Sequence, residues 1–279
     1  MKKFANKIIV SDLDGTFLGE HEEVVQRNVE AIEYFKRNGG YFTVATGRVA
    51  MHVSGAIPCI AELINIPAVT CNGACLFDFR TGKVVASYPI DHDSIMALVT
   101  FVKQNFPDVG VRASSPNYCF VTSKDDIKNP LIAKEFEKYI DCDNYINEYE
   151  TWSDATIFKV VLRLDSERVK EVTAAIREHF GDKFAVTQSW PTIIDIQLGG
   201  INKASSLEKY VRTTIGEGVK MYACGDYIND IEMLTAADVA VCPSNAHESV
   251  KKIADVCLCS NAQGLIADLV EYIEKNDCN

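Results

Sequence analysis

The stretch Lys7-Ile8-Ile9-Val10-Ser11-Asp12-Leu13-Asp14-Gly15-Thr16 decides the fold of this chain. Its first residues are mostly apolar and β-branched, a pattern typical of a buried strand. The strand stops at Asp12 and Asp14, which are separated by one residue and followed by a glycine. Because open α/β sheets bind ligands at the carboxyl ends of their strands, we expect these two carboxylates at a ligand-binding edge.

Two aspartates this close repel each other, and a hard divalent cation with oxygen ligands is the simplest partner that offsets the repulsion. A calcium-binding EF-hand loop also begins Asp-x-Asp, but it requires glycine at its sixth position, where this chain has Phe17. On this motif alone a solvent-exposed turn stays open as an explanation, because Asp and Gly are common in turns.

The composition is that of a globular protein with an acidic surface. The chain has 279 residues, 47% of them hydrophobic, and a formal net charge of −11. This length suggests one large domain or two of modest size. The negative charge argues against nucleic acid and anionic membranes as main partners. No apolar run is long enough to cross a bilayer and no signal-peptide core is visible, so we expect a cytoplasmic protein. Its ten cysteines are then small buried side chains in a reducing compartment.

Strands and helices alternate at both ends of the chain, and a different pattern lies between them. The first part predicts strands at 7–10, 41–45 and 67–71 with a helix at 22–37. In the middle part of the chain the pattern predicts helices at 93–106, 130–140 and 166–180. It predicts strands there at 109–113, 118–122, 157–164, 184–188 and 193–197. The last part predicts strands at 219–224, 238–242 and 255–258 and helices at 203–214, from about 229, 245–253 and 263–275, the third of these capped by Asn245.

This order predicts an α/β protein of two domains. Residues 1–86 and 191–279 form a doubly wound, Rossmann-like parallel sheet, and residues 87–190 form an inserted α+β domain. The cleft between the two domains is where we expect the functional site.

Residues with chemically suggestive side chains stand at four places in the predicted sheet domain. They are Asp12 with Asp14, then Thr46, then Lys203 at a helix start, and finally Asp226 with Asn229 and Asp230. The carboxyl ends of parallel strands converge, so these side chains should meet. A phosphoryl group needs such a set: a nucleophile, a metal for its oxygens, hydroxyl donors and a cation.

The four motifs together resemble the haloacid dehalogenase superfamily, and specifically its Cof-like phosphatases. Their Asp-x-Asp-Gly-Thr motif matches residues 12–16, and their Thr-Gly-Arg motif matches Thr46-Gly47-Arg48. Their helix-opening lysine after a large inserted cap matches Lys203, and their Gly-Asp-x-x-Asn-Asp motif matches residues 225–230. The resemblance covers essentially the whole chain and shows no departure at a catalytic position.

The resemblance implies a role for each matched acidic residue. Asp12 would attack phosphorus and form an aspartyl-phosphate, and Asp14 would protonate the leaving alkoxide and later deprotonate water. Mg²⁺ would be held by Asp12, the backbone carbonyl of Asp14 and Asp226. Asn229 and Asp230 would support this metal site.

The remaining matched residues would bind substrate. The resemblance implies that Thr46 and Lys203 hold the phosphoryl oxygens, and that Lys203 also holds Asp12. Substrate-side contacts are expected from the strand-end loops, namely Gly47, Arg48, Asn72 and Gly73. Segments 114–117 and 189–191 in the insert are expected to add specificity contacts, because they lie at the tips of predicted hairpins.

The expected activity is Mg²⁺-dependent hydrolysis of phosphomonoesters of small soluble metabolites. Sugar phosphates are the first choice, and nucleotides and pyridoxal phosphate stay open. A phosphomutase or phosphotransferase would carry the same motifs. A non-catalytic metal-binding regulatory protein is a third possibility, against which the intact Asp12 and Asp14 argue. The sequence leaves the oligomeric state open.

Overall fold

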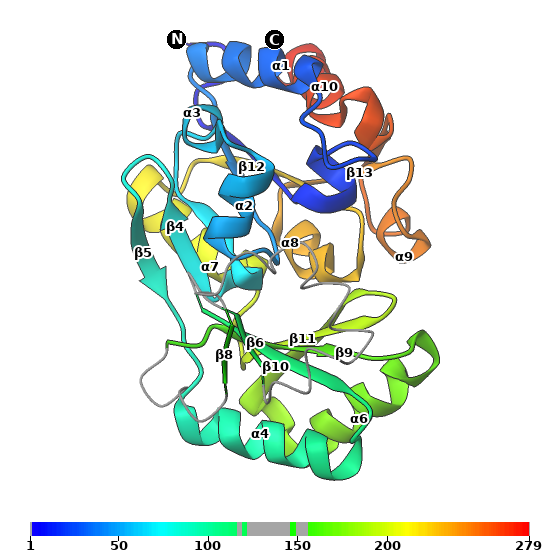
Figure 1. Cartoon of the computed structure of the whole chain (residues 1–279). Helices are drawn as coiled ribbons and strands as arrows, with labels where there is room; N and C mark the ends of the chain where they lie inside the picture. Colours follow the sequence, from blue (N-terminus) through cyan, green and yellow to red (C-terminus); the bar gives the residue numbers. More distant parts are fainter. Residues whose placement is uncertain (1, 116–118, 122–145, 149–155, 279) are drawn as a thin grey trace. The chain divides into compact units, whose positions relative to one another are not determined.

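The computed structural model describes residues 2–115, 119–121, 146–148 and 156–278 (Figure 1). The predicted helix at 130–140, residues 116–117 of the expected specificity segment and part of the strand predicted at 118–122 lie outside these residues. The chain divides into two compact units. The first combines residues 1–86 with 202–279, and the second is residues 87–201.

The first unit is built on a five-stranded parallel sheet with strand order β14-β13-β12-β1-β2. The strands are β1 (Lys7–Ser11), β2 (Tyr41–Val44), β12 (Lys220–Cys224), β13 (Val239–Pro243) and β14 (Val256–Leu258). The motif-bearing strand β1 is inside the sheet, with Ile9 opposite Tyr222 of β12 on one side and Phe42 of β2 on the other. A small sheet of β3 (Ala68–Thr70), β4 (Cys75–Asp78) and β5 (Lys83–Ser87) continues from β2 through a parallel bridge between Ala45 and Val69.

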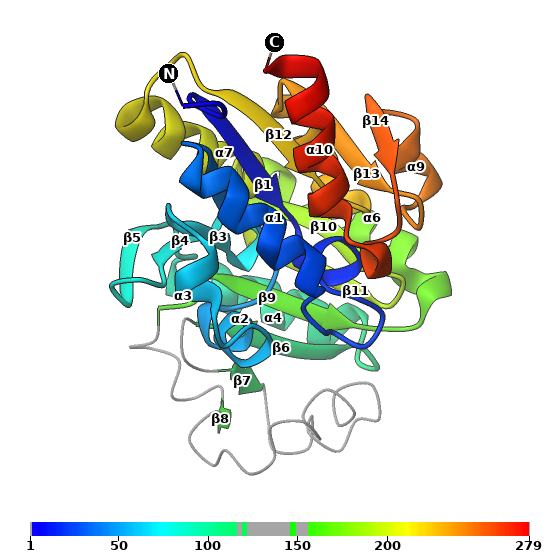
Figure 2. The same ribbon diagram turned by 90° about the horizontal axis from the view of Figure 1, so that it is seen from above.

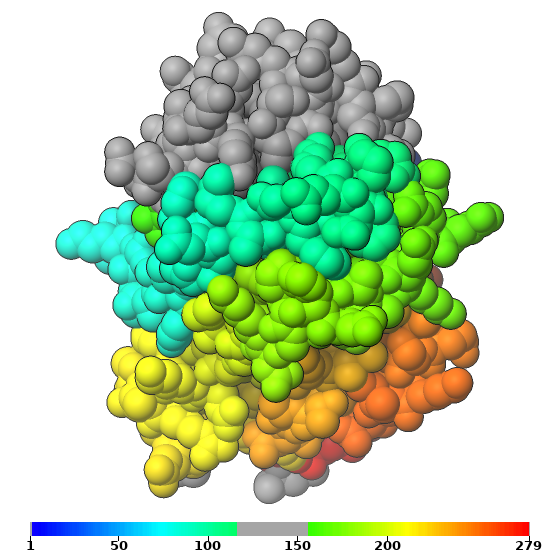
Figure 3. All heavy atoms as spheres, turned by 90° about the horizontal axis from the view of Figure 1, so that it is seen from below, coloured from blue at the N-terminus to red at the C-terminus, as the bar shows by residue number. Residues whose placement is uncertain are grey.

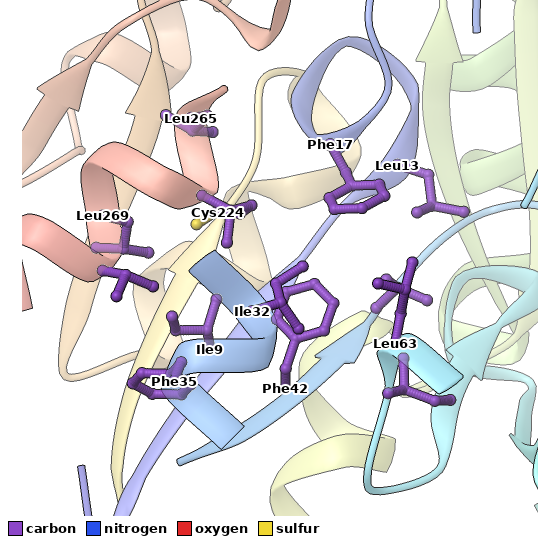
Figure 4. Close-up of a cluster of buried hydrophobic side chains, with 14 of the residues drawn as sticks. Ile9, Leu13, Phe17, Ile32, Phe35, Phe42, Leu63, Cys224, Leu265 and Leu269 are labelled. Carbon is purple, nitrogen blue, oxygen red and sulfur yellow. The ribbon is translucent and has the colours of Figure 1, made fainter. Parts of the chain in front are cut away.

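Helices cover both faces of the large sheet because side chains along each strand alternate in direction. Ile9 belongs to a buried cluster with residues of the helices α1 (Gln26–Arg37), α2 (Ala50–Ala56), α3 (Ile60–Leu63) and α10 (Leu265–Asp277). Figure 4 shows Phe35, Leu63 and Leu269 among the side chains of this cluster. Ile8 and Val10 pack with α7 (Lys203–Tyr210), α8 (Ile231–Ala236) and α9 (Glu248–Lys251) on the opposite face. Figure 2 shows α1 and α10 lying together along one side of β1 and β12. The predicted doubly wound α/β architecture is confirmed.

Helix α1 starts at Gln26, four residues later than predicted. The chain between β1 and α1 folds back on itself, with a bridge between Leu18 and Val24. Glu22 has a left-handed backbone (φ 62°) and its N–H donates to the carbonyl of Gly19 at 3.2 Å. A residue in this conformation cannot continue a helix, so the helix begins only beyond the turn.

The second unit has a six-stranded sheet with strand order β10-β11-β9-β6-β7-β8. Its strands are β6 (Gly110–Ser114), β7 (Cys119–Val121), β8 (Ile146–Glu148), β9 (Lys159–Arg163), β10 (Phe184–Trp190) and β11 (Ile193–Leu198). Neighbouring strands are antiparallel except for β7 and β8. Helices α4 (His92–Asn105) and α6 (Val169–Phe180) share a core with one face of this sheet and lie side by side in Figure 3. Phe101 of α4 stacks on His179 of α6 at 4.4 Å between ring centroids.

The boundary predicted at residue 190 differs from the one in the structure. Strand β11 pairs with both β10 and β9, so it belongs to the second unit, which ends at Ile201. The predicted α+β character of this unit is confirmed, and its sheet is antiparallel apart from the β7–β8 pair. Within the described residues, none of the helices combines the length and apolar character needed to cross a bilayer.

Candidate active site

Four buried charged residues come together at the carboxyl ends of β1 and β12. Asp12 follows β1 directly, and its N–H donates to the carbonyl of Cys224, the last residue of β12, at 2.9 Å. Asp226 follows β12, and Asp230 ends the short 3₁₀ helix Ile228–Asp230. Lys203 is the first residue of α7. The exposed fractions of Asp12, Lys203, Asp226 and Asp230 are 5%, 1%, 8% and 0%.

Lys203 lies between two of the acids. Its Nζ donates to Oδ1 of Asp12 and to Oδ1 of Asp230, each at 2.6 Å. The helix start that carries it is fixed by a capping box, in which the side chain of Asn202 accepts from the N–H of Ser205 at 2.8 Å. Burial lowers the pKa of Lys203, but the two carboxylates outweigh burial, so that the pKa is raised and the ammonium stays charged.

The three acids form a site of the kind that binds a divalent cation. Asp12, Asp226 and Asp230 each offer a carboxylate oxygen, and these oxygens lie within 4.8 Å of one another. Burial and, second, the neighbouring Asp230 raise the pKa of Asp12 well above its usual range and that of Asp226 to about 7. The three carboxylates carry more negative charge than the single positive charge of Lys203 can balance. Carboxylate oxygens are also the ligands that Mg²⁺ prefers. The residues therefore fit a Mg²⁺ ion.

The two later acids of the site have different hydrogen-bond partners. Oδ1 of Asp226 accepts from the hydroxyl of Thr16 at 2.8 Å. Both oxygens of Asp230 are occupied, since Oδ1 accepts from Lys203 while Oδ2 accepts from the N–H groups of Asp226 at 3.0 Å and Tyr227 at 3.2 Å. Asn229, predicted to support the metal, is half-buried in the 3₁₀ helix beside them.

Asp14 has a different environment from Asp12. Its side chain is 46% exposed and makes two hydrogen bonds with the guanidinium of Arg48, one of them from Nε at 2.8 Å. Arg48 also contacts Glu22, at 3.2 Å between Nη2 and Oε2. The two aspartates are separated by the turn that follows β1, because the strand ends at Ser11 and the backbone changes direction through Asp14 (φ −77°) and Gly15 (φ 80°).

Thr46 and the loop after β3 form the other side of the site region. Thr46 is buried, its hydroxyl accepts from the N–H of Arg48 at 3.1 Å, and its carbonyl accepts from the N–H of Asn72 at 2.9 Å. Asn72 is buried in a left-handed conformation (φ 53°). Gly47 lies between Thr46 and Arg48 and is half-buried.

Gly73 packs against the residue that precedes Lys203. A Cβ atom at Gly73 would lie 2.1 Å from the carbonyl oxygen of Asn202, so no larger residue fits there. The hydroxyl of Ser206 in α7 donates to the carbonyl of Gly73 at 2.6 Å. Gly73 thus helps to hold the start of α7, and with it Lys203, in place.

The loop after β13 contributes two residues that were not predicted as site residues. The side chain of Asn245 donates to the carbonyl of Gly15 at 2.8 Å and accepts from the N–H of Asn261 at 3.0 Å. The N–H of His247 donates to the carbonyl of Asp226 at 2.8 Å. The prediction of Asn245 as a helix cap is wrong, because α9 is capped by His247. The polar residues Ser244 and Asn245, which follow β13, are the sequence signal that could have indicated these site residues, because they stand at the same sheet edge as Asp12.

Comparisons with known proteins identify the family of this chain. Residues 9–270 match the family model of haloacid dehalogenase-like hydrolases. The 5-amino-6-(5-phospho-D-ribitylamino)uracil phosphatase YbjI of Escherichia coli (strain K12) is 26% identical over 272 residues, which cover 97% of each chain. The pyridoxal phosphate phosphatase YbhA of the same organism is 23% identical over 287 residues, covering 95% of this chain and 97% of its own.

Solved structures show the same fold. The crystal structure of SMU.1108c from Streptococcus mutans UA159 has a TM-score of 0.82 at 20% identity and covers 96% of this chain and 99% of its own. A haloacid dehalogenase-like hydrolase from B. subtilis has a TM-score of 0.80 at 19% identity, with 98% and 100% covered. The family match spans most of the chain and confirms the resemblance of its motifs. The chain therefore belongs to the haloacid dehalogenase-like hydrolases, in their Cof-like subgroup.

Proposed function

We propose that this protein is a Mg²⁺-dependent phosphatase that hydrolyses phosphomonoesters of small metabolites through an aspartyl-phosphate. The observation that carries the proposal is the buried contact of Lys203 with Asp12 and Asp230, beside Asp226. A buried carboxylate next to a fixed cation and a cation-binding site suits nucleophilic attack on a phosphoryl group. The relatives named as phosphatases support the same reaction.

Asp12 and Asp226 would ligate the Mg²⁺ directly, with the carbonyl of Asp14, whereas Asp230 would support them because both its oxygens already accept hydrogen bonds. The bound ion would supply positive charge for the phosphoryl oxygens during transfer. Lys203 stays charged and keeps the Asp12 carboxylate oriented. Thr46, with Asn72 and Gly47 in the adjoining backbone, is proposed to meet the substrate's phosphoryl group.

The two chemical steps balance through the pair of aspartates. In the first, an Asp12 oxygen bonds to phosphorus, the ester P–O bond breaks, and Asp14 gives its proton to the leaving alkoxide. In the second, water attacks the same phosphorus, Asp14 takes a proton from that water, and Asp12 is regenerated as inorganic phosphate leaves. No oxidant or further co-reactant is needed.

Sugar phosphates are the first class of substrate that we propose. Pyridoxal phosphate and 5-amino-6-(5-phospho-D-ribitylamino)uracil come next, since relatives are named for their hydrolysis. The test is phosphate release from these compounds and from nucleotides, with Mg²⁺ or with EDTA, by the wild type and by Asp12→Asn. We expect release that needs both Mg²⁺ and Asp12, and the best substrate identifies the class.

Asp108→Asn is the matched control, because Asp108 is an aspartate of the second unit that pairs with Arg168. It should leave turnover unchanged. Release by Asp12→Asn at the wild-type rate would refute the aspartyl-phosphate route. Transfer of phosphate to an added sugar in place of water would instead show a phosphotransferase on the same scaffold.

A further inference from the structure

Arg48 makes three contacts with two acids, and none of them is with the buried cluster around Lys203. Its Nε donates to Oδ2 of Asp14 at 2.8 Å, and its Nη2 bonds to Oδ1 of the same carboxylate. Its Nη2 also lies 3.2 Å from Oε2 of Glu22. This is the fork geometry in which a planar guanidinium holds a carboxylate in one orientation.

The backbone on both sides of this cluster is fixed. Arg48 donates its N–H to the hydroxyl of Thr46 at 3.1 Å, and its carbonyl accepts from the N–H of Cys71 at 3.0 Å. Glu22 stands in the turn closed by the bridge between Leu18 and Val24. The left-handed backbone at Glu22 is disfavoured for a residue with a side chain, so the turn is held by its surroundings.

We propose that Arg48 is a positioning residue for Asp14, and that Glu22 in turn fixes the Arg48 guanidinium. This replaces the substrate contact expected of Arg48 and rests on the proposed function, in which Asp14 transfers protons. Asp14 needs such a clamp because its side chain is 46% exposed and is followed by Gly15 at φ 80°. When one Asp14 oxygen carries the proton for the leaving group, the bond from Arg48 Nε to the other oxygen persists.

The consequence is a dependence on the leaving group. Misplacing a general acid slows the reaction of esters whose leaving group needs a proton and spares those whose leaving group departs as a stable anion. Phenyl phosphate and 4-nitrophenyl phosphate are such a pair, nearly equal in size and unequal in leaving-group basicity. The ratio kcat/KM reports on the step in which Asp12 is phosphorylated.

The experiment measures kcat/KM for both esters, with Mg²⁺, in wild type, Arg48→Ala, Asp14→Asn and the double variant. We expect Arg48→Ala to lose about tenfold or more on phenyl phosphate and about threefold or less on 4-nitrophenyl phosphate. When Arg48→Ala is added to Asp14→Asn, kcat/KM should fall by no more than about a further twofold. The effects of two residues that act through the same function are not additive. Inhibition by inorganic phosphate should not change with Arg48→Ala.

Three further variants separate positioning from other roles. Arg48→Lys keeps the charge without the fork and should recover only part of the loss, and Glu22→Gln should show a smaller loss with the same preference between esters. Arg27→Ala is the control, since Arg27 also pairs with two acids, Asp268 and Glu271, away from the site. It should behave as wild type.

Additive losses in the double variant, or weaker inhibition by phosphate, would overturn the inference and make Arg48 a substrate ligand. Equal losses on both esters with a lowered melting temperature would overturn it in favour of a purely structural role. A wild type without Mg²⁺-dependent turnover would refute the proposed function and this inference with it. Active wild type with an inactive Asp12→Asn would leave the proposed function standing whatever the Arg48 variants do.

Discussion

Replacing Lys203 by methionine tests the electrostatics of the buried cluster. Methionine has a similar length but no charge, so the variant leaves Asp12, Asp226 and Asp230 close together without their cation. The structure predicts that the first unit loses much of its stability in the absence of Mg²⁺. It also predicts that Mg²⁺ restores more stability to the variant than it adds to the wild type.

The magnitude follows from the distances. At 2.6 Å and an effective dielectric constant of about 20, each contact of Lys203 has a gross Coulomb energy of about 6 kcal/mol. Desolvation of each buried ion opposes this by several kcal/mol. Without the lysine, carboxylate oxygens that lie within 4.8 Å of each other repel by at least about 3.5 kcal/mol on the same scale, until one of the acids takes up a proton. We therefore expect a net loss of about 3–5 kcal/mol, the usual cost of breaking a buried ion pair.

The assay is urea unfolding with EDTA and with Mg²⁺, followed by circular dichroism and by tryptophan fluorescence. The two tryptophans of the chain both fall in the sequence range of the second unit, and Trp190 ends strand β10 of that unit. We therefore use tryptophan fluorescence as the signal of the second unit. Circular dichroism reports on both units, whereas fluorescence reports on the second. Lys203→Met should therefore shift the unfolding of the first unit, which is seen in the dichroism but not in the fluorescence. A bound ion at 100 times its Kd adds about 2.7 kcal/mol to stability, and loss of the competing ammonium lowers that Kd.

Lys159→Met is the matched control. Lys159 lies 3.1 Å from Asp195 in the second unit, and their side chains are 7% and 3% exposed, so its removal also breaks a buried pair. It should lower the stability of the second unit, and Mg²⁺ should add no more stability to this variant than it adds to the wild type. The reasoning is refuted if Lys203→Met is as stable as wild type in EDTA to within about 0.5 kcal/mol, or if Mg²⁺ stabilises both variants equally.

Other substitutions test single contacts. Thr16→Val removes the hydroxyl that orients Asp226 and should weaken Mg²⁺ binding about tenfold or more, measured by calorimetry; unchanged affinity would exclude this orienting role. Gly15→Ala places a Cβ 2.5 Å from Asp226 Oδ2 at φ 80°, so both turnover and melting temperature should fall. The carboxylate of Asp91 caps α4 by accepting from the N–H of Ser94 at 2.9 Å. Asp91→Ala removes this cap and should lower the free energy of unfolding in urea by about 1 kcal/mol. Hydrogen bonds from Ser94 lower the pKa of Asp91, so this contribution is complete above pH about 4 and should vanish as the pH falls through the lowered pKa.

The elements of the core sheet could be predicted because their signals are local. The apolar run before Asp12 and the alternation of strands and helices are properties of short segments, and the order of the four motifs placed Asp12, Lys203 and Asp226 at one sheet edge. The end of the insert was misplaced because Trp190-Pro191 is typical of a boundary. In the structure β11 follows that turn and pairs back onto β10.

The contacts that connect loops could not be predicted. The pairing of Arg48 with Asp14 and the double role of Asn245 depend on which loops meet at the sheet edge. The late start of α1 depends on the bridge between Leu18 and Val24, a pairing that the helical periodicity of Val25 and Val29 conceals. Such side chains have several possible partners in the sequence, and only the tertiary fold selects among them.

The split first unit has a consequence for the order of folding during synthesis. Strand β1 leaves the ribosome early, yet it pairs with β12, in which Lys220 is opposite Lys7. The sheet around Asp12 therefore cannot form until β12 has been made, more than 200 residues after β1, and Ile8 and Ile9 lack this partner meanwhile. Residues 87–201 are continuous and can fold first as a unit. Closing so long a loop is slow, and slowed or interrupted translation should expose β1 to aggregation.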